Sequence, residues 1–246
     1  MEREIEFQSE GAVPANEGRT PAEIAAEIDE VYRALPVRNA AAVDRLRKAF
    51  SKRLADCPGN FVLDVGRSLV RNHGRRSGIC YELLHHHPAA FALLGRPELE
   101  ELGDGIASWG STDSFARHLS GPAWVRDRIS TADLQAWARS ADRWWRRAAL
   151  VSTVALNSRV SGGRGDAGRT LEICGLLVED RDDMVVKAMS WALRELIEFD
   201  RAAVVRFLDA QGDRLAARVR REVRNKLETG LKTPSRRSGK RPKGGA

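Results

Sequence analysis

The feature of this 246-residue sequence that most restricts its fold is the regular recurrence of helix start and stop signals. Thr20, Pro21 and Glu23 form a capping box with proline in the first turn, and Pro36 ends the helix that they begin. Apolar residues then recur at helical spacing as far as residue 227, and no segment shows the alternation typical of a strand. The sequence therefore predicts an all-α fold.

The predicted helices follow one another in pairs. Residues suited to the N-cap position precede further amphipathic segments, namely Asn39, Ser130, Asp142 and Asp200. The expected helices have about 10 to 17 residues, and successive pairs recur every 35 to 45 residues or so, which is typical of a helical-repeat solenoid. Such an array leaves a concave face exposed, and this face can follow a long, curved partner such as duplex nucleic acid.

The net charge of +7 is distributed unevenly. Six basic residues and no acidic residue follow Gly230, in a segment rich in proline, glycine and serine. We expect residues 231–246 to be a disordered basic tail that can contact phosphates, or one that only improves solubility. Residues 1–19 are predicted to be a disordered acidic segment, and residues 20–230 to form the helical-repeat domain.

Composition excludes several classes of protein. No apolar run approaches the roughly 18 residues that a membrane span requires, so we expect a soluble cytoplasmic protein that associates with the nucleoid when bound to DNA. The three cysteines are widely separated, and His85, His86 and His87 lack the spacing of a metal site. We therefore expect no disulfide, no metal and no cofactor.

The stretch from 108 to 119, SWGSTDSFARHL, places Trp109 and Asp113 four residues apart. On one helix these two side chains would lie on the same face, and a π surface beside a carboxylate suits a positively charged partner. An alternative is that Gly110 ends one helix and Thr112 caps the next, with Asp113 placed only to favour the helix dipole. The residues alone leave both interpretations open.

Two later helices carry similar clusters of aromatic and basic residues. The first has Trp144 and Arg147 three residues apart with Arg146 beside them, and the second has Lys187, Trp191 and Arg194 at spacings of four and three. Each cluster alone is consistent with a core tryptophan and arginines that extend to solvent. Together with the first stretch, they indicate a groove that could bind a phosphate backbone.

These three stretches resemble the AlkD-type alkylpurine DNA glycosylases. The similarity rests on SWGSTDSFARHLSG, on RWWRRAALVS, and on the third block, which begins DDMVVKAMSWALREL. It covers residues 99–227, and upstream of residue 99 the sequence departs from the family pattern. The resemblance implies an all-α fold of HEAT-like repeats and hydrolysis of the N-glycosidic bond of N3- and N7-alkylated purines in duplex DNA. It also implies that neither a metal nor base flipping is needed.

The resemblance also implies a role for individual residues. Asp113 corresponds to the catalytic aspartate, Trp109 and Trp191 to its two tryptophans, and Arg147 to an arginine that holds a phosphate near the lesion. Arg146, Lys187 and Arg194 would bind the duplex irrespective of its sequence.

Two other classes of function remain as alternatives. A non-catalytic helical-repeat scaffold could bind DNA or protein, but an unpaired Asp113 on a DNA-facing surface would repel phosphate without any benefit. An RNA-binding repeat protein would carry a base-reading pattern in every repeat, and the sequence has none. We therefore expect a monomeric DNA glycosylase whose partner is duplex DNA with alkylated purines.

Overall fold

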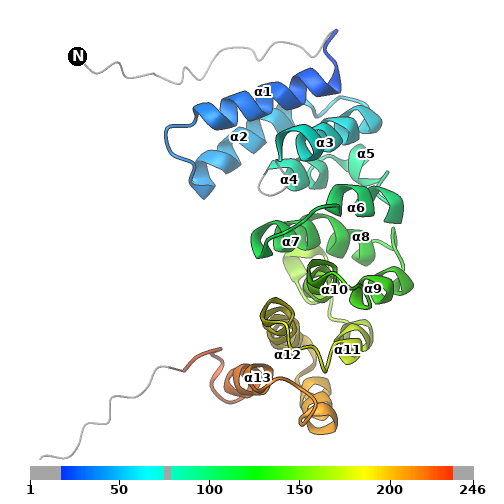
Figure 1. The fold of residues 1–246 in the computed structure, drawn as a ribbon, viewed down its shortest axis with the longest axis vertical. Helices are drawn as coiled ribbons and strands as arrows, with labels where there is room; N and C mark the ends of the chain where they lie inside the picture. The colour runs from blue at the N-terminus through cyan, green and yellow to red at the C-terminus, as the bar shows by residue number, and fades with distance from the viewer. Residues whose placement is uncertain (1–17, 75–78, 235–246) are drawn as a thin grey trace, which may run out of the picture. The chain divides into compact units, whose positions relative to one another are not determined.

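The computed structural model describes residues 18–74 and 79–234, and every regular element in these ranges is a helix (Figure 1). The α-helices are α1 Pro21–Ala34, α2 Ala40–Arg53, α3 Gly59–His73, α4 Tyr81–His85, α5 Pro88–Phe91, α6 Arg96–Gly103, α7 Trp109–Phe115, α8 Gly121–Val125, α9 Thr131–Ala138, α10 Arg143–Leu156, α11 Ala167–Leu176, α12 Asp183–Gln211 and α13 Ala217–Thr229. A π-helical turn, η2 Ala116–Ser120, joins α7 to α8, and a 3₁₀ turn, η3 Arg159–Ser161, follows α10. The predicted all-α fold is confirmed.

The chain divides into two compact units, with the boundary between Leu102 and Gly103. The predicted acidic segment and basic tail fall mostly outside the described residues, which exclude 1–17 and 235–246. The assembly of the helix pairs into one solenoid with a concave face stays a prediction. No helix in the described part of the chain is long and apolar enough to cross a membrane.

Unit 1 is built on the helix signals read from the sequence. Thr20 and Glu23 form the expected capping box of α1, and Asn39 caps α2 by accepting a hydrogen bond from the backbone N–H of Ala42. Helix α3 packs against α1, α4 and α5. Its C-terminus is closed by Gly74, which adopts the left-handed conformation (φ 62°) that glycine tolerates best.

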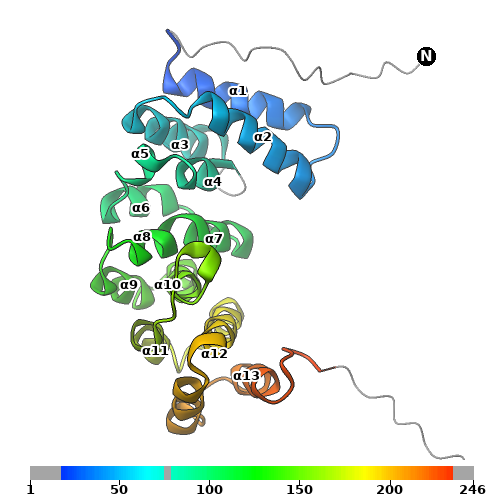
Figure 2. The same cartoon turned by 180° about the vertical axis from the view of Figure 1, so that it is seen from behind.

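Helix α10 is central to unit 2. It contacts α7, η2, α8, α9, α11 and α12, and these neighbours surround it in Figures 1 and 2. All ten of its residues from Arg147 to Leu156 are buried. Asp142 caps the helix by accepting a hydrogen bond from the N–H of Trp144 at 2.8 Å, as the sequence predicts.

Helix α7 is oriented by its buried face. Phe115 is fully buried, and its ring lies 5.8 Å from that of Trp145, which in turn lies 4.9 Å from that of Trp137. Gly103 permits this packing, because a Cβ atom there would lie 2.6 Å from the Trp145 ring. With this face of α7 fixed in the core, the side of the helix that carries Trp109 and Asp113 is directed outward.

Helix α12 has a break at Asp200, where the backbone leaves the helical region (φ −143°, ψ 79°). The Asp200 side chain accepts a hydrogen bond from the N–H of Ala203 at 2.8 Å and thereby caps the second half. This confirms the prediction that a new helix begins at Asp200.

Candidate functional site

Unit 2 contains an open pocket of about 440 Å³. Its lining comes from α7, α10, α12 and the segment after α13, and consists of Trp109, Asp113, Arg147, Met184, Lys187, Trp191, Arg194 and Lys232. Six of the seven residues predicted for the site therefore border one cavity. Four cationic side chains and a single carboxylate line it, so the pocket suits an anionic partner that also presents a local positive charge.

Asp113 and Arg147 form a bidentate ion pair. Arg147 donates from Nε to Oδ1 and from Nη2 to Oδ2 of Asp113, both at 2.8 Å. Arg147 Nη1 donates to the backbone carbonyl of Met184 in the first turn of α12. One guanidinium group thus connects α7, α10 and α12, and it fixes the plane of the carboxylate.

The ion pair changes the roles expected for both residues. The sequence leads us to expect an unpaired Asp113, and the resemblance implies an Arg147 that holds a phosphate. Arg147 is only 5% exposed, and its donors are directed at Asp113 and Met184. The side chain of Asp113 keeps 16% exposure at the pocket, so its remaining lone pairs are accessible while its orientation is held.

Trp109 occupies the first position of α7. Ser108 is the N-cap, accepting a hydrogen bond from the N–H of Ser111 at 3.2 Å. The alternative in which Gly110 ends one helix and Thr112 caps the next is therefore wrong. The Trp109 indole is 63% exposed at the pocket. A large apolar side chain that contributes so little to the core is available to contact a partner.

The opposite side of the pocket is formed by one face of α12. The indole N–H of Trp191 donates to Glu195 at 3.0 Å, which fixes the ring on the helix surface. Arg194 donates from Nε to Ser190 Oγ at 3.3 Å, and Lys187 lies 2.6 Å from Asp183. The spacings of four and three residues between Lys187, Trp191 and Arg194 place all three on this face, as expected from the sequence.

The electrostatics of this face favour an added anion. Burial lowers the pKa of the Arg194 guanidinium, and the charges of Glu222 and Glu195 oppose that shift. Within the described residues, no hydrogen bond or ion pair is made by its two terminal nitrogens. Contact with an anion would stabilise a partly desolvated guanidinium whose terminal N–H groups have no acceptor.

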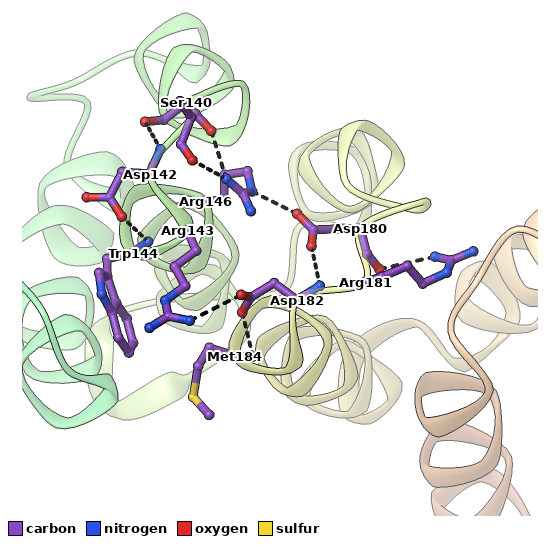
Figure 3. A network of polar contacts seen from close by, with 10 residues as sticks. Ser140, Asp142, Arg143, Trp144, Arg146, Asp180, Arg181, Asp182 and Met184 are labelled. Carbon is purple, nitrogen blue, oxygen red and sulfur yellow. Dashed lines mark hydrogen bonds and ion pairs between the residues drawn. The ribbon is translucent and has the colours of Figure 1, made fainter.

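Arg146 does not belong to the pocket. Its guanidinium donates to Asp180 at 2.7 Å and to the backbone carbonyls of Ser140 and Ala141 at 3.0 and 2.8 Å (Figure 3). These contacts give Arg146 a structural role, and its contact with DNA stays a prediction. Asp180 also accepts from the N–H of Asp182, so Arg146 connects the start of α10 to the loop before α12.

We expect Arg146→Ala to lower the free energy of unfolding by about 1 to 3 kcal/mol, because three acceptors lose a charged donor. Urea unfolding followed by circular dichroism measures the change. Arg143→Ala is the matched control on the same helix. Arg143 lies 3.4 Å from Asp182 and its side chain is 51% exposed, so its removal should cost less than about 1 kcal/mol. Equal losses for the two variants would contradict the role given to Arg146.

Two residues near the pocket were missed by the sequence analysis. Glu222 is 8% exposed and accepts a hydrogen bond from Ser190 at 2.6 Å, and Lys232 Nζ lies 3.5 Å from the same Glu222 oxygen. The signal for Glu222 was its place in an apolar stripe, between Val219 and Val223 at helical spacing. Lys232 was assigned to the tail, and nothing in the local sequence distinguishes it from the other basic residues there.

The structure gives no candidate metal centre in residues 18–74 and 79–234, where no three His, Cys, Asp or Glu side chains are grouped to hold an ion. Within the same residues, no disulfide joins Cys57, Cys80 and Cys174. Burial raises the pKa of the Cys174 thiol to about 12, which leaves it without thiolate reactivity at neutral pH.

Comparison with known families shows which family the chain belongs to. The sequence matches the family model described as DNA alkylation repair enzyme over residues 81–227, whereas no curated protein and no solved structure matches significantly. The match extends further toward the N-terminus than the resemblance at residues 99–227, and it includes every pocket residue except Lys232. It covers more than half of the chain, which therefore belongs to the DNA alkylation repair enzyme family.

Proposed function

We propose that the protein is a monofunctional DNA glycosylase that hydrolyses the N-glycosidic bond of N3- and N7-alkylated purines in duplex DNA. The observation that carries the proposal is the pocket in which Asp113, held by Arg147, lies with Trp109, Trp191 and several cations. A pocket with this lining suits a substrate that has an anionic backbone and a cationic centre.

The charge of the substrate determines what catalysis must provide. A purine alkylated at N3 or N7 is already positively charged, so it leaves as a neutral base when it takes the electron pair of the glycosidic bond. The departing base therefore needs little general-acid catalysis. The remaining barrier is the positive charge that develops on C1′ and the ring oxygen of the deoxyribose, which a nearby carboxylate stabilises.

Asp113 has the geometry for this task. Each of its oxygens accepts one N–H from Arg147, and the lone pairs that remain can face the sugar and a water molecule. As the bond from C1′ to the purine nitrogen breaks, the water oxygen bonds to C1′ and its proton passes to Asp113 and then to solvent. The products are a neutral alkylpurine and an abasic sugar.

The other pocket residues would hold the lesion without a base-binding cavity. The indoles of Trp109 and Trp191 offer π faces to the cationic sugar, and Lys187 and Arg194 offer donors to the flanking phosphates. The exposed position of Trp109 favours contact with the sugar and backbone at the surface of the duplex. In the proposed mechanism the damaged base need not be flipped out of the duplex.

The scaffold alternative gains some support from the ion pair. An unpaired Asp113 would disfavour a scaffold, but Asp113 is paired, and a bidentate bridge to Arg147 is also what a structural connection between α7 and α10 would look like. What favours catalysis is the exposed Trp109 beside that carboxylate, because a purely structural pair has no use for an indole directed away from the core.

The test is release of the base. The purified full-length chain is incubated with duplexes that contain one 7-methylguanine or 3-methyladenine, and the free base and the abasic site are quantified. We expect release from both duplexes in the presence of EDTA and none from undamaged DNA. Binding without release from either duplex would favour the scaffold.

We expect Trp109→Ala to reduce base release by about two- to thirtyfold, the range that corresponds to loss of a cation–π contact of about 0.5 to 2 kcal/mol. The substitution should change the free energy of unfolding by no more than about 0.5 kcal/mol, because the Trp109 side chain is 63% exposed. Trp109→Phe keeps a π face and should restore part of the activity. Trp144→Ala is the control, since Trp144 lies outside the pocket lining. A similar loss of activity in both alanine variants would contradict the role of Trp109.

A further inference from the structure

The cations around α12 and α13 outnumber the carboxylates that could neutralise them. Asp183 lies 2.6 Å from both Lys187 and Arg218, and Glu222 lies 3.5 Å from Lys232 and 3.9 Å from Arg218. The hydrogen bond from Lys187 contributes most to lowering the pKa of Asp183, and Arg218 adds to the shift. Two acidic groups are thus shared among several basic groups, which leaves the cluster with excess positive charge.

Lys232 is attached to this cluster by a reversal of the chain after α13. Gly230 has the left-handed conformation (φ 74°), in which a side chain would be strained, and its N–H donates to the carbonyl of Lys226. The backbone carbonyl of Lys232 accepts a hydrogen bond from Asn225 at 3.0 Å, and its ammonium group lies near Glu222. Figure 1 shows this segment in red where it continues from α13.

Glu222 remains well satisfied without Lys232. Ser190 donates to it at 2.6 Å, and Arg218 is close to its other oxygen. The side chain of Lys232 is about half exposed, and exposed pairs of this kind contribute little. The ammonium group can therefore turn from Glu222 toward an anion in the pocket at small cost.

We infer that Lys232 is a substrate-contacting residue whose ammonium group leaves Glu222 to bind a DNA phosphate at the pocket. The inference rests on the proposed function for the nature of the ligand. It assigns a role to a residue outside the segment that matches the family, because that match ends at residue 227. The contact is with the backbone, so it applies equally to damaged and undamaged duplexes.

The experiment measures binding of a fluorescent duplex by anisotropy over a range of salt concentrations. Loss of one phosphate contact flattens the slope of log K against log salt by about 0.9, so Lys232→Gln should weaken binding by about eightfold at 0.1 M salt. Lys232→Arg keeps the charge and should restore both the slope and the affinity. Lys226→Gln removes the same charge from α13, where Lys226 pairs with Glu198 at 2.7 Å and does not line the pocket. We expect this control to keep the wild-type slope.

The outcomes separate this inference from the proposed function. If Lys232→Gln keeps the wild-type slope while wild-type protein releases alkylated bases, the inference is overturned and the glycosylase proposal stands. If no base is released but the slope flattens only for Lys232→Gln, the contact stands and the glycosylase proposal fails. Equal flattening for Lys226→Gln would also overturn the inference, since it would mean that the duplex responds to net charge alone.

Discussion

Replacing Asp113 with asparagine is expected to reduce release of 7-methylguanine from duplex DNA by at least about 100-fold, while binding of undamaged duplex changes little. Asparagine has nearly the same shape as aspartate, but it carries no negative charge for the developing cation and cannot take a proton from water. Single-turnover release at saturating enzyme isolates the chemical step, and anisotropy reports binding. Activity equal to that of the wild type would remove Asp113 from the mechanism.

The control for Asp113→Asn is the same substitution at another ion-paired aspartate. Asp44 in unit 1 lies 2.6 Å from Arg47 and 2.7 Å from Lys48 and is not part of the pocket. Asp44→Asn should release base at the wild-type rate. If both variants lose activity together, the loss reflects removal of an ion pair in general.

Replacing Arg147 is expected to affect both stability and activity. Arg147→Ala leaves Asp113 without its two donors and Met184 without one, and it opens a cavity between α7, α10 and α12. Loss of one partner of a fully buried ion pair lowers the free energy of unfolding by about 3 to 5 kcal/mol. Because Asp113 is partly exposed, we expect the free energy of unfolding to fall by about 2 to 4 kcal/mol. Urea unfolding measures this change.

Arg147→Lys separates positioning from folding. Lysine keeps the charge but cannot form two parallel bonds to the carboxylate and a third to the Met184 carbonyl. We expect base release to fall about tenfold or more in protein that remains folded, since small misplacements of a reacting group are costly. Adding Asp113→Asn should then cause less loss than it does in the wild type. Full additivity of the two losses would show that Arg147 does not act through Asp113.

The starts of several helices were predictable because the signals that set them are local. Ser130 and Asp133 form the capping box of α9, and Asp142 and Asp200 cap the segments that follow them. Each cap requires only a side-chain oxygen and a backbone N–H two or three residues later, so the sequence contains the whole interaction. The helical faces that bear Arg147 and Trp191 could be identified for the same reason, whereas the residues alone left the helix of Trp109 and Asp113 undecided.

The partners of the charged residues were not predictable in this way. Asp113 and Arg147 are 34 residues apart, and only the packing of α7 against α10 brings them together. Arg146 and Arg147 differ little in sequence context, but neighbouring residues on a helix point about 100° apart. One therefore reaches the pocket and the other reaches Asp180. Choosing between them requires the positions of α12 and the loop before it.

The ion pair between Asp113 and Arg147 has a consequence for how a negatively charged polymer approaches the site. At distances well beyond their separation, the two opposite charges nearly cancel, so the incoming strand meets a dipole rather than an isolated anion and experiences little repulsion. Only a group in contact with the carboxylate oxygens experiences their full negative potential. The arrangement thus confines attraction for a cation to the immediate surroundings of the Asp113 carboxylate and leaves long-range attraction of the strand to the lysines and arginines around it.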